Sequence, residues 1–137
     1  MQIPLPLYPD GIDPDLLNAL KIAAKQSENW ELSPLLQRVH NHVEKARSLR
    51  VQNPMVHVRL AEAIAQVYSA VHDRWEQIPE VAHPWLKGAM FYFTEADDDD
   101  PDFSSPIGFE DDVEVLNACL HMAGLKELCM NPADFDS

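Results

Sequence analysis

Residues 53–78 read NPMVHVRLAEAIAQVYSAVHDRWEQI, and this stretch gives the clearest indication of the fold class. Its apolar side chains recur at steps of three and four, which places them on one face of an α-helix. The residues on this face are Val56, Leu60, Ala63, Ile64, Val67, Tyr68, Val71, Trp75 and Ile78. Asn53 followed by Pro54 is typical of a helix start, because the Asn side chain can accept a free backbone N–H and Pro suits the first helical position. We therefore predict a helix over 54–77.

The same pair of a capping residue and a proline occurs twice more in the chain. These pairs are Asp13-Pro14 and Ser33-Pro34. They predict helices over 14–29 and 34–51, and both segments carry apolar residues at helical spacing. The signal is strong because it recurs three times with the same mechanism.

Two further helices are predicted on either side of an Asp-rich loop. One begins near Pro84 and runs through Phe93, and the other covers 110–129. Because no alternating strand pattern of useful length occurs, we predict an all-α, single-domain helical bundle of about five helices over 1–137, the last two forming a hairpin. We read residues 1–12 as an extended N-terminal arm and 130–137 as a frayed tail.

The charge of the chain is concentrated in the stretch TEADDDDPDFSSPIGFEDDVE, residues 94–114. It holds ten carboxylates and neither Lys nor Arg, whereas the whole chain has 23 acids, 10 bases and a net charge of −13. Without this stretch, 13 acids face 10 bases. Most of the imbalance therefore belongs to 21 residues, which we call the acidic stretch.

This composition excludes several classes of function. A chain of net charge −13 has no basic patch with which to bind nucleic acid or anionic lipid. No apolar run approaches the length of a membrane span, and the first residues lack the pattern of a secretory signal. Two cysteines, Cys119 and Cys129, are too few for a disulfide framework. We expect a soluble cytoplasmic protein.

A set of residues at fixed spacing surrounds the acidic stretch. The set is Tyr92, Asp98, Pro101-Asp102-Phe103, Gly108 and Asp111-Asp112. Over Tyr92 to Asp112 the chain thereby resembles the YkvA-like family, a bacterial domain of unknown function. Together with the two predicted helices that flank this segment, the resemblance covers about a third of the chain, and it implies a helix, a shaped loop and a second helix.

The chain also departs from this family pattern. Ala96 and Ser105 stand where the family usually has Pro. Acids stand at positions that are usually apolar in the family, namely Asp97, Asp99, Asp100 and Glu110. Those apolar residues make many members of the family look membrane-associated, so the acids found here argue against a membrane role.

Four aspartates fit both the family pattern and a candidate metal site. They are Asp98, Asp102, Asp111 and Asp112. Hard divalent cations such as Ca²⁺ and Mg²⁺ prefer oxygen ligands, and a shared ion would relieve repulsion between neighbouring carboxylates. The structural alternative is that the first two bond loop N–H groups and the last two complement the dipole of the following helix. The spacing does not match an EF-hand loop, because Phe103 and Phe109 occupy its Gly and Glu positions.

Three hypotheses for function follow. The first is a non-enzymatic interaction module that presents the acidic stretch to a basic protein partner or a cation. The second is a divalent-metal-dependent enzyme or metal-binding protein that uses the four aspartates. The third is a small-ligand binder with an aromatic-lined pocket that includes Trp85 and Tyr92. The six histidines show no metal-binding spacing, we assign no catalytic or cofactor-binding residue, and a homo-oligomer through the helix at 54–77 stays open.

Overall fold

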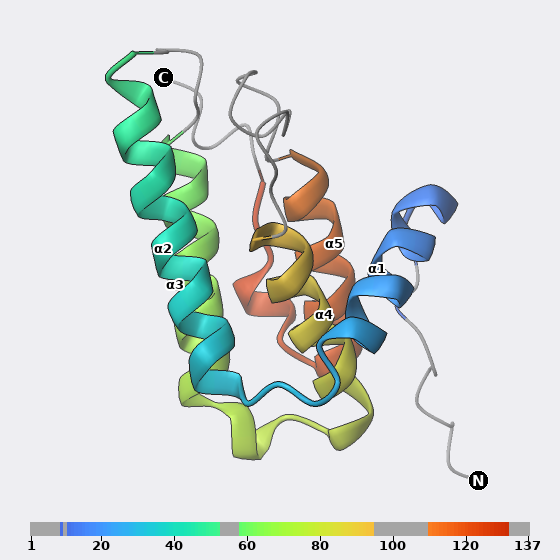
Figure 1. Cartoon of the computed structure of the whole chain (residues 1–137). Helices are drawn as coiled ribbons and strands as arrows, with labels where there is room; N and C mark the ends of the chain where they lie inside the picture. Colours follow the sequence, from blue (N-terminus) through green and yellow to red (C-terminus); the bar gives the residue numbers. More distant parts are fainter. Residues whose placement is uncertain (1–8, 10, 53–57, 95–109, 132–137) are drawn as a thin grey trace, which may run out of the picture.

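The computed structural model describes residues 9, 11–52, 58–94 and 110–131, and its architecture is all-α (Figure 1). The five α-helices are α1 (Pro14–Gln26), α2 (Leu32–Arg50), α3 (Val58–Asp73), α4 (His83–Thr94) and α5 (Glu110–Ala123). Three short 3-10 helices join or follow them: η1 (Trp75–Gln77), η2 (Glu80–Ala82) and η4 (Lys126–Leu128). The described ranges contain no strand, which confirms the predicted fold class.

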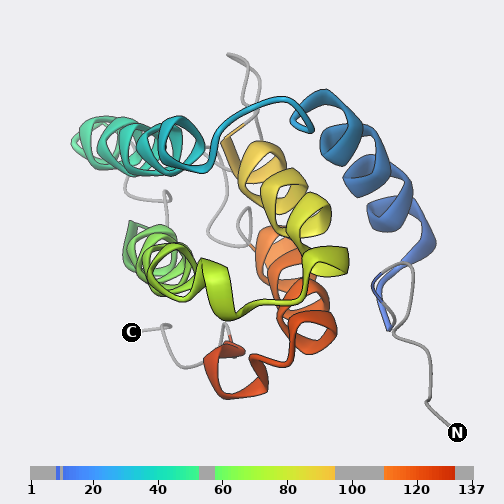
Figure 2. The ribbon, with the colours of Figure 1, turned by 90° about the horizontal axis from the view of Figure 1, so that it is seen from below.

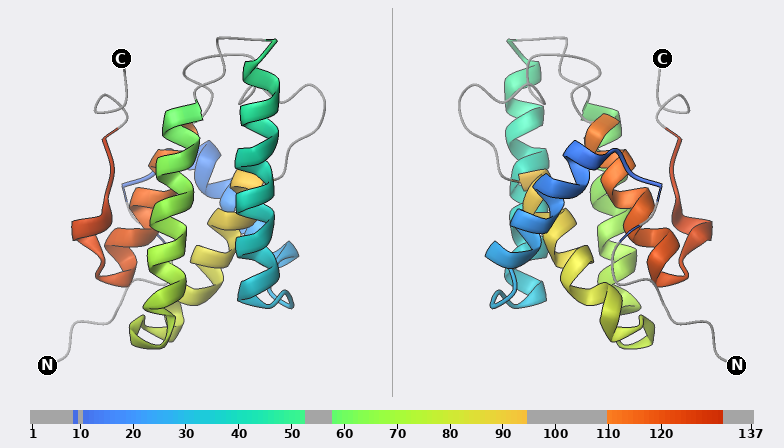
Figure 3. Two further views of the ribbon diagram at one scale, coloured as in Figure 1. Left: turned by 90° about the vertical axis from the view of Figure 1, so that its left-hand side faces the viewer. Right: turned by 90° about the vertical axis from the view of Figure 1, so that its right-hand side faces the viewer.

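Helix α4 is the centre of the bundle. It packs against α1, α2 and α5, while α2 also packs along α3. Figure 2 shows α4 between α1 on one side and the α2–α3 pair on the other, and Figure 3 shows the same arrangement from two sides. The reason lies in its sequence, HPWLKGAMFYFT, which offers apolar or small residues around most of the helix and can therefore be covered on several sides.

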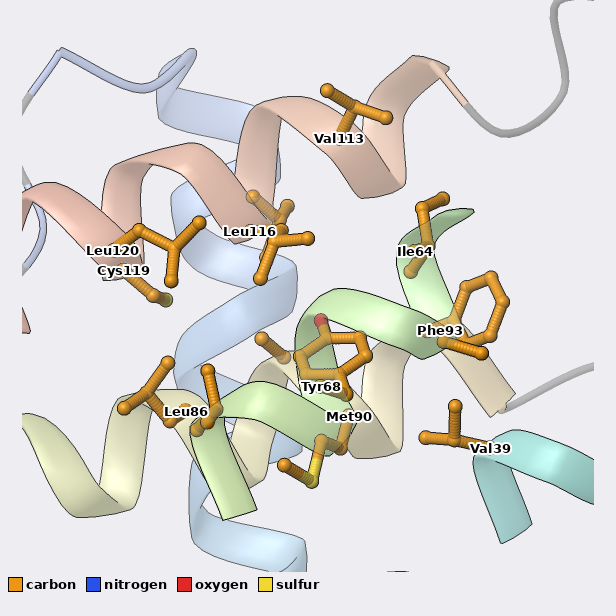
Figure 4. Close-up of a cluster of buried hydrophobic side chains, with 14 of the residues drawn as sticks. Val39, Ile64, Tyr68, Leu86, Met90, Phe93, Val113, Leu116, Cys119 and Leu120 are labelled. Atoms are coloured by element: carbon orange, nitrogen blue, oxygen red, sulfur yellow. The ribbon is translucent and has the colours of Figure 1, made fainter. Parts of the chain in front are cut away.

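The core is formed by the inward faces of all five helices. Figure 4 shows Tyr68 of α3, Met90 and Phe93 of α4, and Leu116 of α5 turned toward one another. The largest fully buried side chains are Tyr68, Phe93, Leu20, Leu35, Leu60, Ile64, Leu86, Met90, Leu116, Leu120 and Val39. Burying each of them stabilises the fold by roughly 1.5–3 kcal/mol before the loss of conformational entropy is counted.

Helices α1 and α4 approach each other through their backbones. A Cβ atom added at Gly88 would lie 2.7 Å from the Cα atom of Ala24, closer than real Cβ contacts occur. A glycine on one helix opposite an alanine on the other therefore sets the distance between these two helices.

The three helix starts predicted from capping residues have different outcomes. Asp13 caps α1 as predicted, since its side chain accepts a hydrogen bond of 2.8 Å from the backbone N–H of Asp15. The prediction for Ser33 is wrong: α2 begins at Leu32, its N-cap is Glu31, and no side chain caps it. Asn53 lies outside the described residues.

The predicted helix ends are too late. Helix α1 stops at Gln26, where the buried Ser27 hydroxyl donates to the carbonyl of Ala23. Helix α3 stops at Asp73 and gives way to η1. Helix α5 stops at Ala123, and Cys129 lies beyond both α5 and η4. The expectation that Cys129 shares a helix with Cys119 is therefore wrong.

A glycine ends α5. Gly124 has φ +77°, its N–H bonds to the carbonyl of His121, and the N–H of Leu125 bonds to the carbonyl of Leu120. This pair of hydrogen bonds is the Schellman arrangement, in which a left-handed residue satisfies the last carbonyls of a helix.

The ends of the described chain pack on the bundle. Pro9 is buried, Ile12 packs against the core, and the backbone N–H of Asp13 donates to Glu114 on α5 at 2.8 Å. Near the other end, the Asn117 side chain holds Met130 through two hydrogen bonds of 2.8 Å, one to its carbonyl and one from its N–H. Residues 1–8 and 132–137 of the predicted arm and tail lie outside the described residues.

No helix within the described ranges is both long enough and apolar enough to cross a bilayer.

Candidate functional site

The acidic stretch begins with the last residue of α4 and ends in the first turns of α5. Residues 95–109, including the predicted metal ligands Asp98 and Asp102, lie outside the described residues. The described residues of the stretch are Thr94 and 110–114, and they show how its two ends are attached to the fold.

Thr94 is tied to α2 by a cation–aromatic cluster. The guanidinium of Arg38 lies 5.1 Å from the ring centroid of Trp30 and 4.9 Å from that of Phe91. From this position its Nε donates to Thr94 Oγ1 at 3.1 Å, and the Thr94 hydroxyl donates to the carbonyl of Phe91 at the same distance. Since Arg is well suited to stacking on aromatic faces, the cluster fixes the last turn of α4 at the point where the acidic stretch begins.

Asp111 and Asp112 lie in the first turn of α5, as predicted, but their side chains have different surroundings. Asp111 is exposed, whereas Asp112 is 3% exposed. Neighbouring helical residues point about 100° apart, so the two carboxylates face solvent and the core respectively. Both positions are favourable for negative charge because the N-terminus of a helix carries partial positive charge.

Asp112 faces a polar region inside the core. Burial raises the pKa of Tyr68 well above its ordinary value, and the nearby Cys119 and Asp112 raise it further. Burial likewise raises the pKa of the Cys119 thiol, which lies 3.5 Å from the carbonyl of Trp85. Phenol and thiol are therefore held neutral, and Cys119 is a core thiol with no nucleophilic character.

The predicted metal site is only half described. Among the described residues, no group of three or more His, Cys, Asp or Glu side chains could hold a metal ion. Convergence of Asp98, Asp102, Asp111 and Asp112 on one ion stays a prediction, since two of the four lie outside the described ranges. A shared ion would have to reach both the buried and the exposed carboxylate of α5.

Sequence reasoning missed a buried histidine. His42 is 5% exposed and its ring meets that of Phe93 edge-on, with 4.9 Å between the centroids. Burial, followed by the charges of Lys45 and Arg38, lowers its pKa from 6.5 to about 4. The signal was present in the sequence, because His42 falls on the same helical face as Val39, Val43 and Ala46.

The side of the α2–α3 pair away from the core is polar, and it was also missed. His40 faces Ser69 at 3.3 Å between Nε2 and Oγ, and one heptad later Arg47 bonds Glu62 at 2.9 Å. Between these two pairs lies a groove of about 240 Å³ that is lined by both polar and apolar side chains. This groove lies apart from Trp85 and Tyr92, the residues of the predicted aromatic pocket. The spacing of polar residues along α2 could have indicated a polar stripe, but not that α3 completes it.

Comparisons with known proteins add no family to these observations. No protein-family model, no curated protein and no solved structure matches this chain. The candidate site consequently rests on the residues described above and on the charge of the acidic stretch.

Proposed function

We propose that this protein is a non-enzymatic interaction module that presents the acidic stretch to a basic protein partner. The observation that carries the proposal is the charge distribution, with ten carboxylates and no base in residues 94–114. A high local density of one charge attracts an oppositely charged surface and speeds its encounter.

The attachment of the stretch supports this proposal. Its first residue, Thr94, is bonded to Arg38, and its last, Glu114, accepts a hydrogen bond from the backbone of Asp13. Both ends are therefore fixed on a packed helical body.

A pair of charge-matched variants tests the proposal. One changes Asp97, Asp98, Asp99 and Asp100 to Asn, and the control changes Glu28, Glu31, Glu76 and Glu80 to Gln. All four control residues are exposed. Each variant removes four negative charges, so the two differ only in where the charge is lost.

Binding of a fluorescent oligolysine peptide is measured by anisotropy at several salt concentrations. We expect the aspartate variant to bind much more weakly than the control, and salt to weaken binding to the wild type steeply. Equal losses in the two variants would mean that only net charge matters, and the proposal would be wrong.

Metal binding through the same aspartates is the alternative. Thermal melts with Ca²⁺, Mg²⁺ or Mn²⁺ against a chelator test it, because an ion that binds only the folded protein raises its melting temperature. The absence of any shift at millimolar metal would remove this alternative. We also propose that the chain is a YkvA-like domain and that it is located in the cytoplasm.

A further inference from the structure

The groove between α2 and α3 has walls that form hydrogen bonds and an apolar floor. Val43 of α2 and Ala65 of α3 form the floor, and both are nearly fully buried. Ala65 is small, so the floor is low at this point and the two helices leave a hollow of about 240 Å³. A volume of this size admits a molecule of a few non-hydrogen atoms, smaller than a drug-sized ligand.

One end of the groove carries charge. Arg47 uses its two terminal nitrogens to bond Glu44 Oε1 and Glu62 Oε2. Within the described chain, the second oxygen of each carboxylate accepts no hydrogen bond. Two carboxylates and one guanidinium give this end a local charge of −1, in a protein of net charge −13.

The other end offers neutral hydrogen-bonding groups. The Gln37 side-chain amide donates to Asn41 Oδ1 at 3.0 Å, and within the described chain no hydrogen bond occupies the Gln37 oxygen or the Asn41 nitrogen. The amide of Gln66 lines the opposite wall. An anion in the groove would meet the two carboxylates at the charged end. A purely apolar molecule would remove water from the amides at the neutral end without replacing their hydrogen bonds.

We propose that this groove binds a small organic cation with an ammonium or guanidinium head and a short alkyl stem. The head lies against the second oxygens of Glu44 and Glu62, and the stem lies on Val43 and Ala65. This site shares no residue with the acidic stretch, so it goes beyond the proposed function and stands or falls separately from it.

The experiment uses 1,4-diaminobutane as the cation and 1,4-butanediol as its neutral counterpart of similar length. Both are titrated at low salt and neutral pH into the variant with Asp97 to Asp100 changed to Asn, which weakens competing attraction by the acidic stretch. The side-chain amide signals of Asn41 and Gln66 in nitrogen–proton NMR spectra report on the groove. We expect saturable shifts with the diamine and none with the diol.

Three further variants test the role of local charge. Glu44→Gln with Glu62→Gln changes the groove from −1 to +1, and we expect the diamine to bind about tenfold more weakly. Arg47→Gln changes the groove to −2, and we expect tighter binding. The control, Glu76→Gln with Glu80→Gln, removes the same two charges from exposed positions on η1 and η2 and should bind as the parent does.

Opposite effects of the glutamate and arginine changes separate recognition from damage to the fold, because damage would weaken binding in both. The proposal is overturned if the diol shifts the same signals, if the control loses as much affinity as the groove variant, or if Arg47→Gln weakens binding. It is also overturned if the diamine gives no saturable shift at Asn41 and Gln66.

Discussion

His42 makes the stability of this protein depend on pH in a defined window. Its pKa is about 4 in the folded protein, because of burial and the charges of Lys45 and Arg38, and its ordinary value is 6.5. Between these values the unfolded chain binds a proton that the folded protein does not. The free energy of unfolding therefore falls as the pH falls from about 6.5 toward 4, and it is fully retained above 6.5.

The gap between the two pKa values sets the size of this effect. Each pH unit of difference corresponds to about 1.4 kcal/mol, so lowering the pH through both pKa values removes about 3 kcal/mol of unfolding free energy. That is a large share of the 5–15 kcal/mol that usually stabilises a domain. About half of the loss falls between pH 6.5 and pH 5, where most exposed carboxylates remain ionised and contribute little.

Urea denaturation at a series of pH values from 7.5 to 4.5 measures this dependence. The variant His42→Gln lacks the titrating ring, and its unfolding free energy should change much less over the window. His121→Gln is the control, because His121 is exposed on α5. If the wild type and His42→Gln lose the same free energy between pH 7.5 and pH 5, the account of His42 given above is wrong.

Substitutions at three positions test the packing of the fold, each by chemical denaturation. Gly88→Ala should lower the unfolding free energy by about 1–3 kcal/mol, because the added methyl group meets the backbone of Ala24; an increase, as expected for Ala in an uncrowded helix, would show that α1 and α4 are not in close contact. Tyr68→Phe should leave stability unchanged or raise it by about 1 kcal/mol, because the buried hydroxyl has no hydrogen-bond partner among the described residues; a clear loss would reveal a partner. Gly124→Ala should cost about 1–2 kcal/mol through its φ of +77°, and Gly124→Asn less; equal stability of all three proteins would contradict the proposed end of α5.

The sequence indicated the number and type of the helices because their apolar spacing is a local property. The stripe from Leu60 to Val71 depends only on residues within one helix. Leu60, Ile64, Tyr68 and Val71 are buried as predicted, whereas Ala63 and Val67 are half-buried. The start of α1 was predictable for the same reason, since Asp13 caps its own neighbour Asp15.

Features that depend on two helices could not be predicted in this way. Ser33 resembles a cap in the sequence, yet α2 begins two residues earlier than predicted, at Leu32, and the Ser33 hydroxyl lies 3.4 Å from His72 of α3. The importance of Gly88 arises from Ala24, which is distant in the chain. The late end predicted for α5 has a local cause instead, because Gly124 is a stop signal visible in the sequence.

The position of charge relative to packing connects the two proposals. Of the bases in the described helices, Arg38 is held between Trp30 and Phe91, and Arg47 is held between Glu44 and Glu62. Both guanidinium groups already interact with other side chains of the protein, so they offer little positive charge to a ligand. The acids of residues 97–100 have no basic neighbour in the sequence, and the second oxygens of the groove carboxylates accept no hydrogen bond within the described chain, so both places can attract cations. A basic protein and a small cation can therefore be recognised at separate places by the same physical property, an excess of carboxylate oxygen over available donors.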